Sequence, residues 1–463
     1  MMKFSTFQEE DLKVLKDIVG EENVSTDQSE LLIHSTDAFP GKWIKPDVIV
    51  WPENPEQVSR IVQYANQHRL PVTPRGAGSS LSGNVIPVYH GIVLNFRRMN
   101  RIVEIRDKDL QVIVEPGVVY DELNLKLQQF NLFFPPDPSS SSVCTIGGMV
   151  ANNASGLGAV KYGVTRDYGL GLQLVLPNGK IIRTGSHAIK SSTGYDLLSL
   201  FVGSEGTLGV ITTVTLRLRT LPSARKTAAA YFDTVSSATD AVSEIMRTGI
   251  TPAAMEFLDR ESIISINRSE NLGLHENAAM LIAEFHGTDE SATRELKLAT
   301  ETFRSHGAIE IREAEGDNER KKLWAGRKGA YPSLVRSALS VIIGDIVVPI
   351  SKITEMLQEV YDIAAKYDVR VACFGHCGDG NVHPNILTDR KNKDLWERAL
   401  RVNEEIVRYA IKLGGVASGE HGIGLEKKQF MQLEHGDSLE LMRTIKTLLD
   451  PNDIMNPGKF VDD

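Results

Sequence analysis

Cysteine is scarce in this sequence, and its scarcity excludes several kinds of protein. The 463 residues include three cysteines, Cys144, Cys373 and Cys377. An odd and small number in a chain of this length predicts no disulfide framework and a reducing compartment. It also excludes an iron–sulfur cluster bound by four cysteines of this chain alone. If the protein transfers electrons one at a time, another molecule must receive them.

Excess basic charge and long apolar runs are lacking as well. Lys and Arg number 51 against 60 Asp and Glu, and the net charge of −9 argues against a non-specific nucleic-acid binder. No apolar run approaches the ~18 residues that would span a membrane. The first residues also lack the apolar core of a signal peptide. We therefore expect a cytoplasmic protein, with peripheral attachment at the inner membrane face left open.

The remaining composition is that of a globular protein, with 41% hydrophobic and 24% charged residues. Its length allows about two to four domains. Residues 45–220 alternate short apolar runs with turn signals, which predicts many strands and few helices. Residues 226–400 contain three strand–helix–strand units with long helices. They predict a second α+β domain whose sheet is covered on one face.

A glycine-rich loop at residues 74–83 is the first dense chemical signal. Its glycines allow tight turns and expose backbone N–H donors that can surround a phosphate. Leu81 stands where a Rossmann loop has its third glycine, and a turn and strand are expected to follow rather than a helix. No Gly-Lys-Ser/Thr occurs, which excludes a P-loop. For this loop alone, an ordinary Gly/Ser turn is an equal alternative.

Two further stretches weaken that alternative. Residues 135–156 are rich in Pro, Ser, Gly and Asn, and residues 203–211 read Gly-Ser-Glu-Gly-Thr-Leu-Gly-Val-Ile. The three stretches supply many backbone donors without a local positive cluster. This combination favours an extended ligand with a pyrophosphate and rings over a single phosphate.

Together these stretches resemble the FAD-binding domain of the vanillyl-alcohol-oxidase-type flavoproteins. The resemblance is closest to the FAD-linked D-2-hydroxy-acid dehydrogenase and oxidase branch, which includes glycolate oxidase and D-lactate dehydrogenase. It extends from about residue 45 to Lys459. It implies an α+β fold, with a two-part FAD-binding domain of vanillyl-alcohol-oxidase/PCMH type and an α+β ferredoxin-like cap domain. The implied domains are 1–222 for FAD, 223–413 for the substrate, and 414–463 for a segment that returns to the FAD domain and completes the active site.

By the same resemblance, the first loop wraps the FAD pyrophosphate, residues 137–156 line the ADP and flavin, and residues 206–211 supply backbone contacts. Relatives with covalent FAD use a histidine near the first loop, where this chain has Ser79 and Ser80, so we expect non-covalent FAD. The implied cofactor-binding residues are Pro74, Arg75, Gly76, Ala77, Gly78, Ser79, Ser80, Gly83, Asn84, Pro136, Asp137, Ser140, Thr145, Gly147, Gly148, Asn152, Gly156, Gly206, Gly209, Val210, Ile211 and Asn456.

A second constellation lies at residues 374–385. Asp379-Gly380 between two extended runs is a strong hairpin signal. With those two residues as the turn, His376 pairs with His383. The two imidazoles then face each other on one side of the ladder, within reach of one metal ion.

The best third ligand is Glu420, because nearby glycines let the chain approach the site closely. Two histidines and a carboxylate with open positions suit a catalytic divalent metal, either Zn, Mn or Fe, rather than a structural site. Alternation along the strand places Cys377 on the opposite face, and Cys144 and Cys373 are expected in the core. Two histidines held by hydrogen bonds at a turn remain the simpler alternative. The resemblance agrees with the metal interpretation, since all three residues match the metal ligands of the branch.

Two further residues have predicted catalytic roles. His421 is the general-base candidate, because an imidazole with a reference pKa of ~6.5 suits abstraction of an alcohol proton. Its alternative is a hydrogen bond within the loop. Arg327 is the expected carboxylate anchor, since Arg offers a planar bidentate fork. Only the Leu-Trp-x-x-Arg pattern of the resembled family distinguishes it from a solvated arginine in a charge-rich helix.

The substrate is expected to be small. Diacid-specific relatives carry a further basic residue shortly before the strand that begins at Asp345, where this chain has Val341–Gly344. Glycolate or D-lactate is therefore favoured over 2-hydroxyglutarate. In the resulting hypothesis, Arg327 and the metal hold the substrate, His421 removes the hydroxyl proton, and the hydride passes to flavin N5.

The electrons must then reach an external acceptor, either a quinone, a cytochrome or an iron–sulfur partner subunit. We expect no nucleic-acid partner. The oligomeric state stays open, with a homodimer as one option. One alternative function is a non-catalytic flavin subunit that relays electrons, although a relay needs neither base nor metal. Another is a metallohydrolase, but the chain lacks His-Glu-x-x-His and the glycine loops would go unexplained.

Overall fold

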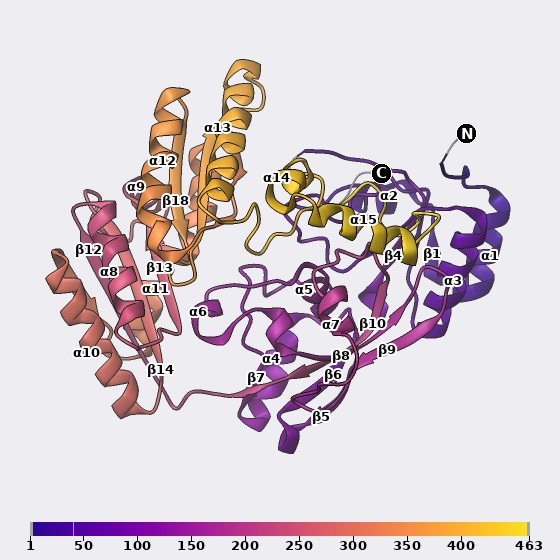
Figure 1. Cartoon of the computed structure of the whole chain (residues 1–463), viewed down its shortest axis with the longest axis horizontal. Coiled ribbons are helices and arrows are strands. Elements are labelled where there is room, and N and C mark those ends of the chain that lie inside the picture. The colour runs from indigo at the N-terminus through magenta and orange to yellow at the C-terminus, as the bar shows by residue number, and fades with distance from the viewer. Residues whose placement is uncertain (1–2, 40, 461–463) are drawn as a thin grey trace. The chain divides into compact units, whose positions relative to one another are not determined.

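A computed structural model describes residues 3–39 and 41–460 (Figure 1). By their internal contacts these residues divide into two units. Unit 1 comprises the residues up to Ser155, Val164–Leu221, and the residues from Glu420 onward. Unit 2 comprises Pro222–Gly419 and the short segment Gly156–Gly163. The three domains predicted from the sequence, 1–222, 223–413 and 414–463, stay predictions.

Unit 1 contains two main sheets. The first has the order β1 (Val24–Ser25), β2 (Val48–Val50), β4 (Ile92–Asn95) and β3 (Val72–Arg75). The second is antiparallel, with the order β5 (Ile102–Arg106), β6 (Gln111–Val114), β10 (Val210–Arg217), β8 (Gly169–Val175) and β9 (Ile181–Gly185). A small pair joins β7 (Leu132–Phe133) to β11 (Arg219–Thr220). Its helices are α1 (Glu9–Val19), α2 (Gln28–Ile33), α3 (Pro55–His68), α4 (Tyr120–Leu127), α5 (Ile146–Asn152), α7 (Leu197–Phe201), α14 (Met431–His435) and α15 (Ser438–Leu449).

Helix α3 illustrates how the sequence forms the core of unit 1. Asn54 caps its first turn by accepting a hydrogen bond from the Gln57 backbone N–H. Apolar residues at helical spacing then turn one face inward, and they are Val58, Ile61, Val62 and Ala65. This face packs into a core with Val48, Val50, Val72 and Leu94 of the first sheet. The parallel pairing of β2, β4 and β3 therefore lies against α3.

The C-terminal segment, yellow in Figure 1, packs with the N-terminal elements of unit 1. The Val72 N–H donates to the Ile454 carbonyl, and the Asn456 N–H donates to the Val72 carbonyl. The Lys446 ammonium donates to the Thr207 and Met455 carbonyls. These bonds attach the end of the chain beside the strand that leads into the first glycine loop.

Unit 2 is built on one antiparallel sheet. The strand order is β15 (Ala308–Glu313), β12 (Ala224–Phe232), β14 (Ala279–Gly287), β13 (Ala254–Leu258), β18 (Arg370–Gly375), β19 (Asn381–Thr388) and β16 (Ser340–Ile343), and β17 (Ile346–Val347) also pairs with β19. Its helices are α6 (Ala159–Tyr162), α8 (Val235–Arg247), α9 (Arg260–Glu270), α10 (Asp289–Ser305), α11 (Asp317–Ser337), α12 (Ile353–Lys366) and α13 (Lys393–Lys412). The predicted combination of strands and helices in an α+β fold is confirmed.

The expectation that helices cover one face of this sheet is wrong. Alternate residues of β12 point to opposite sides, and Phe232 meets Phe303 of α10 while Tyr231 packs with α9 and α11. Helices α8, α10, α12 and α13 therefore lie on one face, and α9 and α11 cover part of the other. Long helices after each strand were readable from the sequence, but the side on which each helix packs depends on contacts distant along the chain.

The described residues contain no helix that is both long enough and apolar enough to cross a membrane.

The burial of Lys459 predicts a pH dependence of stability. Its ammonium donates to the Ile86 carbonyl and to Asn456 Oδ1, and burial lowers its pKa from 10.5 to about 7 against the attraction of Glu205. Between these values the unfolded chain binds more protons, so the free energy of unfolding should rise with pH, by at most about 1.4 kcal/mol per pH unit. Denaturant titrations from pH 7 to 10 should show wild type gaining stability relative to Lys459→Met. If the free energies of unfolding of the two proteins changed equally with pH, the lowered pKa of Lys459 would be contradicted.

Candidate metal centre and active site

The hairpin that carries the two histidines differs from the predicted one. Phe374, not His376, pairs with His383 in β18 and β19. The turn is longer than Asp379-Gly380, because β18 ends at Gly375 and the Asn381 N–H donates to the His376 carbonyl. The predicted register is thus wrong by two residues. His376 lies at the start of the turn rather than in the ladder.

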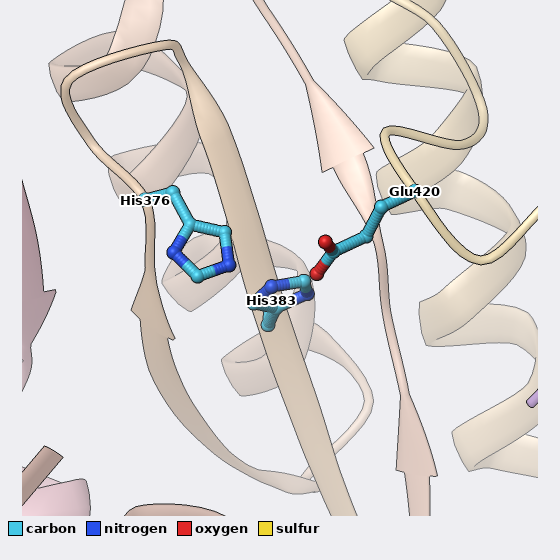
Figure 2. A group of neighbouring side chains, drawn as sticks. All are labelled: His376, His383 and Glu420. Carbon is cyan, nitrogen blue, oxygen red and sulfur yellow. The ribbon is translucent and has the colours of Figure 1, made fainter. Parts of the chain in front are cut away.

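The structure nevertheless brings the three predicted ligands together (Figure 2). His376 and His383 are both buried, and their ring centroids lie 5.3 Å apart with the rings perpendicular. His376, His383 and Glu420 each offer one ligand atom, and these atoms lie within 4.8 Å of one another. Figure 2 shows the Glu420 side chain extending from its loop toward the two rings. The cluster can therefore coordinate one ion.

The hydrogen bonds of the two histidines at Nδ1 suit them to the predicted role as ligands. Nδ1 of His376 lies 2.7 Å from Glu256 Oε1, and Nδ1 of His383 lies 3.1 Å from the Gly344 carbonyl. Because a carbonyl only accepts, His383 must carry its proton on Nδ1, and a carboxylate at His376 favours the same tautomer. The lone pair of each neutral ring is then on Nε2. Metal-bound histidines in proteins are held by this arrangement.

Glu420 is positioned through the residues before it. Asp345 is buried, and its Oδ2 accepts from Ser418 Oγ at 2.8 Å and from the Gly419 N–H at 3.1 Å. Its Oδ1 accepts from Asn381 Nδ2 at 2.9 Å. A Cβ on residue 419 would lie 1.8 Å from Asn381 Nδ2, so glycine is required there. One peptide bond joins this anchored glycine to Glu420.

The donor set fits a divalent metal. Two imidazoles and one carboxylate are the ligands of catalytic Zn, Mn and Fe sites, which keep positions open. Cys377 is not available as a soft ligand, because its thiol donates to the Met255 carbonyl and burial raises its pKa well above the ordinary value. Among the described residues, Asn381 Oδ1 and Asn385 Oδ1 are buried without a hydrogen-bond partner. Both lie on the same face of β19 as His383, since side chains alternate along a strand.

Arg327 is linked to this cluster by a carboxylate that was not predicted. The guanidinium is buried on α11, its Nε donates to Glu256 Oε2 at 2.6 Å, and its carbon lies 4.6 Å from the Phe374 ring centroid. Glu256 thus binds both Arg327 and His376. The sequence did carry a weak signal, because Glu256 is the one charged residue of the apolar strand Ala254–Leu258.

His421 lies in a loop whose far side is fixed by another buried carboxylate. Glu205 Oε1 accepts from the Ile423 N–H at 2.6 Å, and Oε2 accepts from the Gly424 N–H at 2.9 Å. Asn152 donates to the His421 carbonyl at 3.4 Å. The imidazole Nε2 lies 4.0 Å from Glu420 Oε1, and its side chain is 14% exposed. The predicted base and the predicted third ligand are therefore distinct but adjacent.

The three glycine-rich loops converge within unit 1. A Cβ on Gly76 would lie 2.3 Å from Thr145 Oγ1, which shows that the first and second loops are in direct contact. A Cβ on Gly206 would lie 3.2 Å from Pro74 Cγ, so the third loop also meets the first. As expected, no helix follows the first loop before β4. The first loop thus lies against both of the others, as the prediction of one extended cofactor requires.

Several predicted cofactor residues use their side chains to support the loops. Arg75 is buried and donates to the Thr36 carbonyl. Asn84 donates to Glu205 Oε2, and Asn456 donates to the backbone carbonyls of Asn84 and Glu205. Val210 lies in the core of unit 1, and Gly156 belongs by its contacts to unit 2. The side chains of Arg75, Asn84 and Asn456 thus bond within the protein, and contacts to FAD at all of these positions remain predictions.

Comparison with known proteins assigns the class. A model described as "FAD binding domain" matches residues 46–185, and one described as "FAD linked oxidases, C-terminal domain" matches residues 221–460. The second match covers more than half of the chain, so the protein belongs to the family of FAD-linked oxidases. This confirms the predicted family and its FAD cofactor.

Individual relatives span nearly the whole chain. It is 39% identical over 445 residues to the glycolate oxidase subunit GlcD of Bacillus subtilis, covering 96% of this chain and 95% of the relative. It is 36% identical over 446 residues to the mitochondrial D-lactate dehydrogenase [cytochrome] of Arabidopsis thaliana, covering 95% and 78%. The Escherichia coli GlcD subunit is 34% identical over 446 residues, covering 96% and 89%.

Solved structures confirm the predicted fold type. p-Cresol methylhydroxylase superposes with a TM-score of 0.82 at 18% identity, over 98% of this chain and 97% of the other. Alkyldihydroxyacetonephosphate synthase gives a TM-score of 0.78 at 20% identity, over 98% and 87%. At these identities the likeness establishes the fold alone.

The loop surface can be tested at Gly148 in α5. A Cβ there would meet only Thr145 Oγ1, at 3.4 Å, so Gly148→Ala and Gly148→Val should both fold. If the loop lines FAD, Gly148→Val should lose FAD occupancy, measured as flavin absorbance per protein and by titration of the apoprotein. Gly78 is unsuitable for this test, because its φ of +73° and a 2.1 Å approach to Arg75 would strain any side chain.

The matched control is Gly329→Val, in helix α11 of unit 2. Its Cβ would lie 3.6 Å from Glu270 Cγ, an ordinary contact. This variant should retain full FAD. Equal FAD affinity in both valine variants would refute the assignment of the second loop.

Proposed function

We propose that this protein oxidises a small D-2-hydroxy acid, glycolate or D-lactate, to the corresponding 2-oxo acid, using FAD and a divalent metal. The observation that carries the proposal is the cluster of His376, His383 and Glu420, with ligand atoms within 4.8 Å of one another. Glu256 connects the same cluster to the buried Arg327. A metal site linked to a carboxylate-binding arginine suits a substrate with a carboxylate beside a hydroxyl group.

The relatives support this choice of substrate class. The three relatives reported above are named as glycolate oxidase subunits or as a D-lactate dehydrogenase. Both names describe oxidation of a 2-hydroxy acid.

The chain's own residues divide the work of binding. Arg327 would use its two Nη groups for the substrate carboxylate, since its Nε already donates to Glu256. His376, His383 and Glu420 would hold the metal. When bound, the metal supplies a Lewis acid that lowers the pKa of a coordinated hydroxyl, and FAD supplies the acceptor for the hydride.

His421 would remove the hydroxyl proton. Its ring is adjacent to the carboxylate of Glu420, and its backbone carbonyl is held by Asn152. A base placed by main-chain bonds keeps its position when the substrate enters and leaves. This placement supports proton transfer over a purely structural role.

A monocarboxylate fits the sequence of β16. Its residues Val341–Ile343 are apolar, and Ile343 pairs with Asn385 next to the His383 strand position. A second substrate carboxylate would find no cation in this stretch. Glycolate and D-lactate are therefore proposed over a diacid.

The electrons would leave to an external acceptor. The three cysteines are separately buried and free, so they provide neither a cluster nor a redox disulfide. The relatives' printed names include a cytochrome-linked dehydrogenase and oxidase subunits, which supports a separate acceptor molecule.

Anaerobic reduction of the bound flavin tests the proposal directly. Glycolate and D-lactate should bleach the flavin absorbance, while L-lactate and D-2-hydroxyglutarate should act far more slowly or not at all. Because no acceptor is needed for this half-reaction, the assay does not depend on the unknown partner. A flavin that none of the four acids reduces would contradict the proposed reaction.

Metal removal gives a second prediction. Exhaustive chelation, verified by elemental analysis, should abolish this bleaching while FAD stays bound, because the predicted metal ligands are not among the glycine-loop residues. Readdition of Zn²⁺, Mn²⁺ or Fe²⁺ should restore it and identify the active metal. An unchanged bleaching rate in metal-free protein would exclude a catalytic metal.

The neighbours Glu420 and His421 should separate by phenotype. Loss of a ligand lowers metal content, whereas loss of a base leaves metal and substrate affinity nearly intact and slows reduction by about 10²–10⁴-fold. We expect Glu420→Ala to lose metal and His421→Ala to keep it. Elemental analysis and stopped-flow flavin reduction measure the two effects.

A second adjacent Glu-His pair, Glu434 and His435 in α14, provides the control. Glu434→Ala and His435→Ala should retain metal content and reduction rate. A metal-depleted His421→Ala beside a metal-replete Glu420→Ala would reverse the two assignments.

A further inference from the structure

Glu256 occupies an unusual position in unit 2. Its side chain is fully buried in the middle of β13, among apolar residues. One oxygen lies 2.7 Å from His376 Nδ1, and the other accepts from Arg327 Nε at 2.6 Å. A single carboxylate therefore binds one member of the metal cluster and the predicted substrate anchor, which lie 49 residues apart in the chain.

The two bonds fix more than the positions of these residues. Donation from Nδ1 to a carboxylate fixes the tautomer and the plane of the His376 ring and makes Nε2 a stronger donor to a metal. Donation from Nε fixes the plane of the Arg327 guanidinium, and hence the direction of its Nη edge. Both planes are thus set relative to one rigid carboxylate group.

A second buried carboxylate on the same face of the sheet, Glu284, serves as a comparison with a purely structural role. Glu284 of β14 is also buried, and it accepts from Trp324 Nε1 at 2.7 Å and from Arg320 at 3.2 Å, both in α11. It also lies 2.7 Å from His286 Nε2. This carboxylate attaches α11 to the sheet through the same types of partner, but it contacts neither His376 nor Arg327.

We propose that Glu256 is a positioning residue that couples the metal site to the substrate anchor, in addition to attaching α11 to the sheet. The roles of His376 and Arg327 in this inference rest on the proposed function. The consequence is specific: loss of the Glu256 carboxylate weakens metal binding and substrate binding together. Loss of the Glu284 carboxylate affects stability alone.

Glu256→Gln is the most informative variant, because it preserves volume and removes one acceptor. Glutamine offers one carbonyl oxygen and one NH₂ group. The carbonyl should face the charged Arg327, which leaves the NH₂ group facing His376 Nδ1. That ring must then accept at Nδ1 and carry its proton on Nε2, the tautomer that cannot ligate through Nε2.

The first readout is metal affinity in the absence of turnover. Calorimetric titration of chelated holoflavoprotein with Zn²⁺ or Mn²⁺ should show 10–100-fold weaker binding for Glu256→Gln, the range typical for partners of metal-bound histidines. Glu284→Gln should bind the metal as wild type does, even where its unfolding temperature falls. Equal metal affinities in the two glutamine variants would overturn the proposal.

The second readout is the substrate concentration dependence of flavin reduction, at saturating metal. Glu256→Gln should raise the half-saturating concentration of hydroxy acid. In an Arg327→Met background the same substitution should change that concentration only slightly, because the coupled anchor is already absent. Full additivity of the two substitutions would also contradict coupling.

Two further outcomes keep the inference separate from the proposed function. A wild-type protein that binds no stoichiometric metal would refute the proposed function, and with it this inference. If the wild type binds metal and turns over, but Glu256→Gln and Glu284→Gln have equal metal affinities, the inference is refuted and the proposed function stands. If Glu256→Gln does not fold, the double variant Glu256→Met/Arg327→Met is used instead. The proposal then requires that the double variant bind metal more weakly than the single variant Arg327→Met.

Discussion

The candidate site depends on a short passage of chain, Gly419–Gly424, whose backbone is fixed at both ends by buried carboxylates. Asp345 accepts from the Gly419 N–H, and Glu205 accepts from the N–H groups of Ile423 and Gly424. The side chains of Glu420 and His421 are carried between these two anchors. Main-chain bonds therefore fix the backbone of the passage on both sides of the predicted ligand and the predicted base.

Buried carboxylates recur as the means of joining distant segments. Glu256 joins residues near 327 and 376, Asp345 joins 381 to 419, and Glu205 joins 84 to 423. Burying a carboxylate is unfavourable unless donors surround it, and removing one donor leaves a charge uncompensated. Each carboxylate therefore tolerates only the arrangement that satisfies it. Each carboxylate thus restricts the local backbone of the segments that it joins.

The sequence predicted which side chains lie together at the candidate site, but it did not predict the hairpin register or the buried carboxylate that positions them. Glycines beside Glu420, and two histidines flanking a turn signal, were sufficient to select three side chains that the structure brings together. The hairpin register was wrong because the Asn381 N–H bonds to the His376 carbonyl and lengthens the turn, a choice that Asp379-Gly380 alone does not determine. Glu256 escaped prediction because its partners are remote in sequence. A lone carboxylate in an apolar strand indicates a buried partner without identifying it.

The glycine loops show a complementary division between side chain and backbone. The polar side chains of Arg75, Asn84 and Asn456 bond to the protein itself, and Arg75 carries a pKa lowered by burial. For the pyrophosphate predicted at these loops, the groups that remain are chiefly backbone N–H donors beside small residues, which can bind anions without a formal charge. Binding of this kind would need no basic cluster in the loops. It would also explain why glycine spacing, rather than any charged motif, carries the signal for FAD in this sequence.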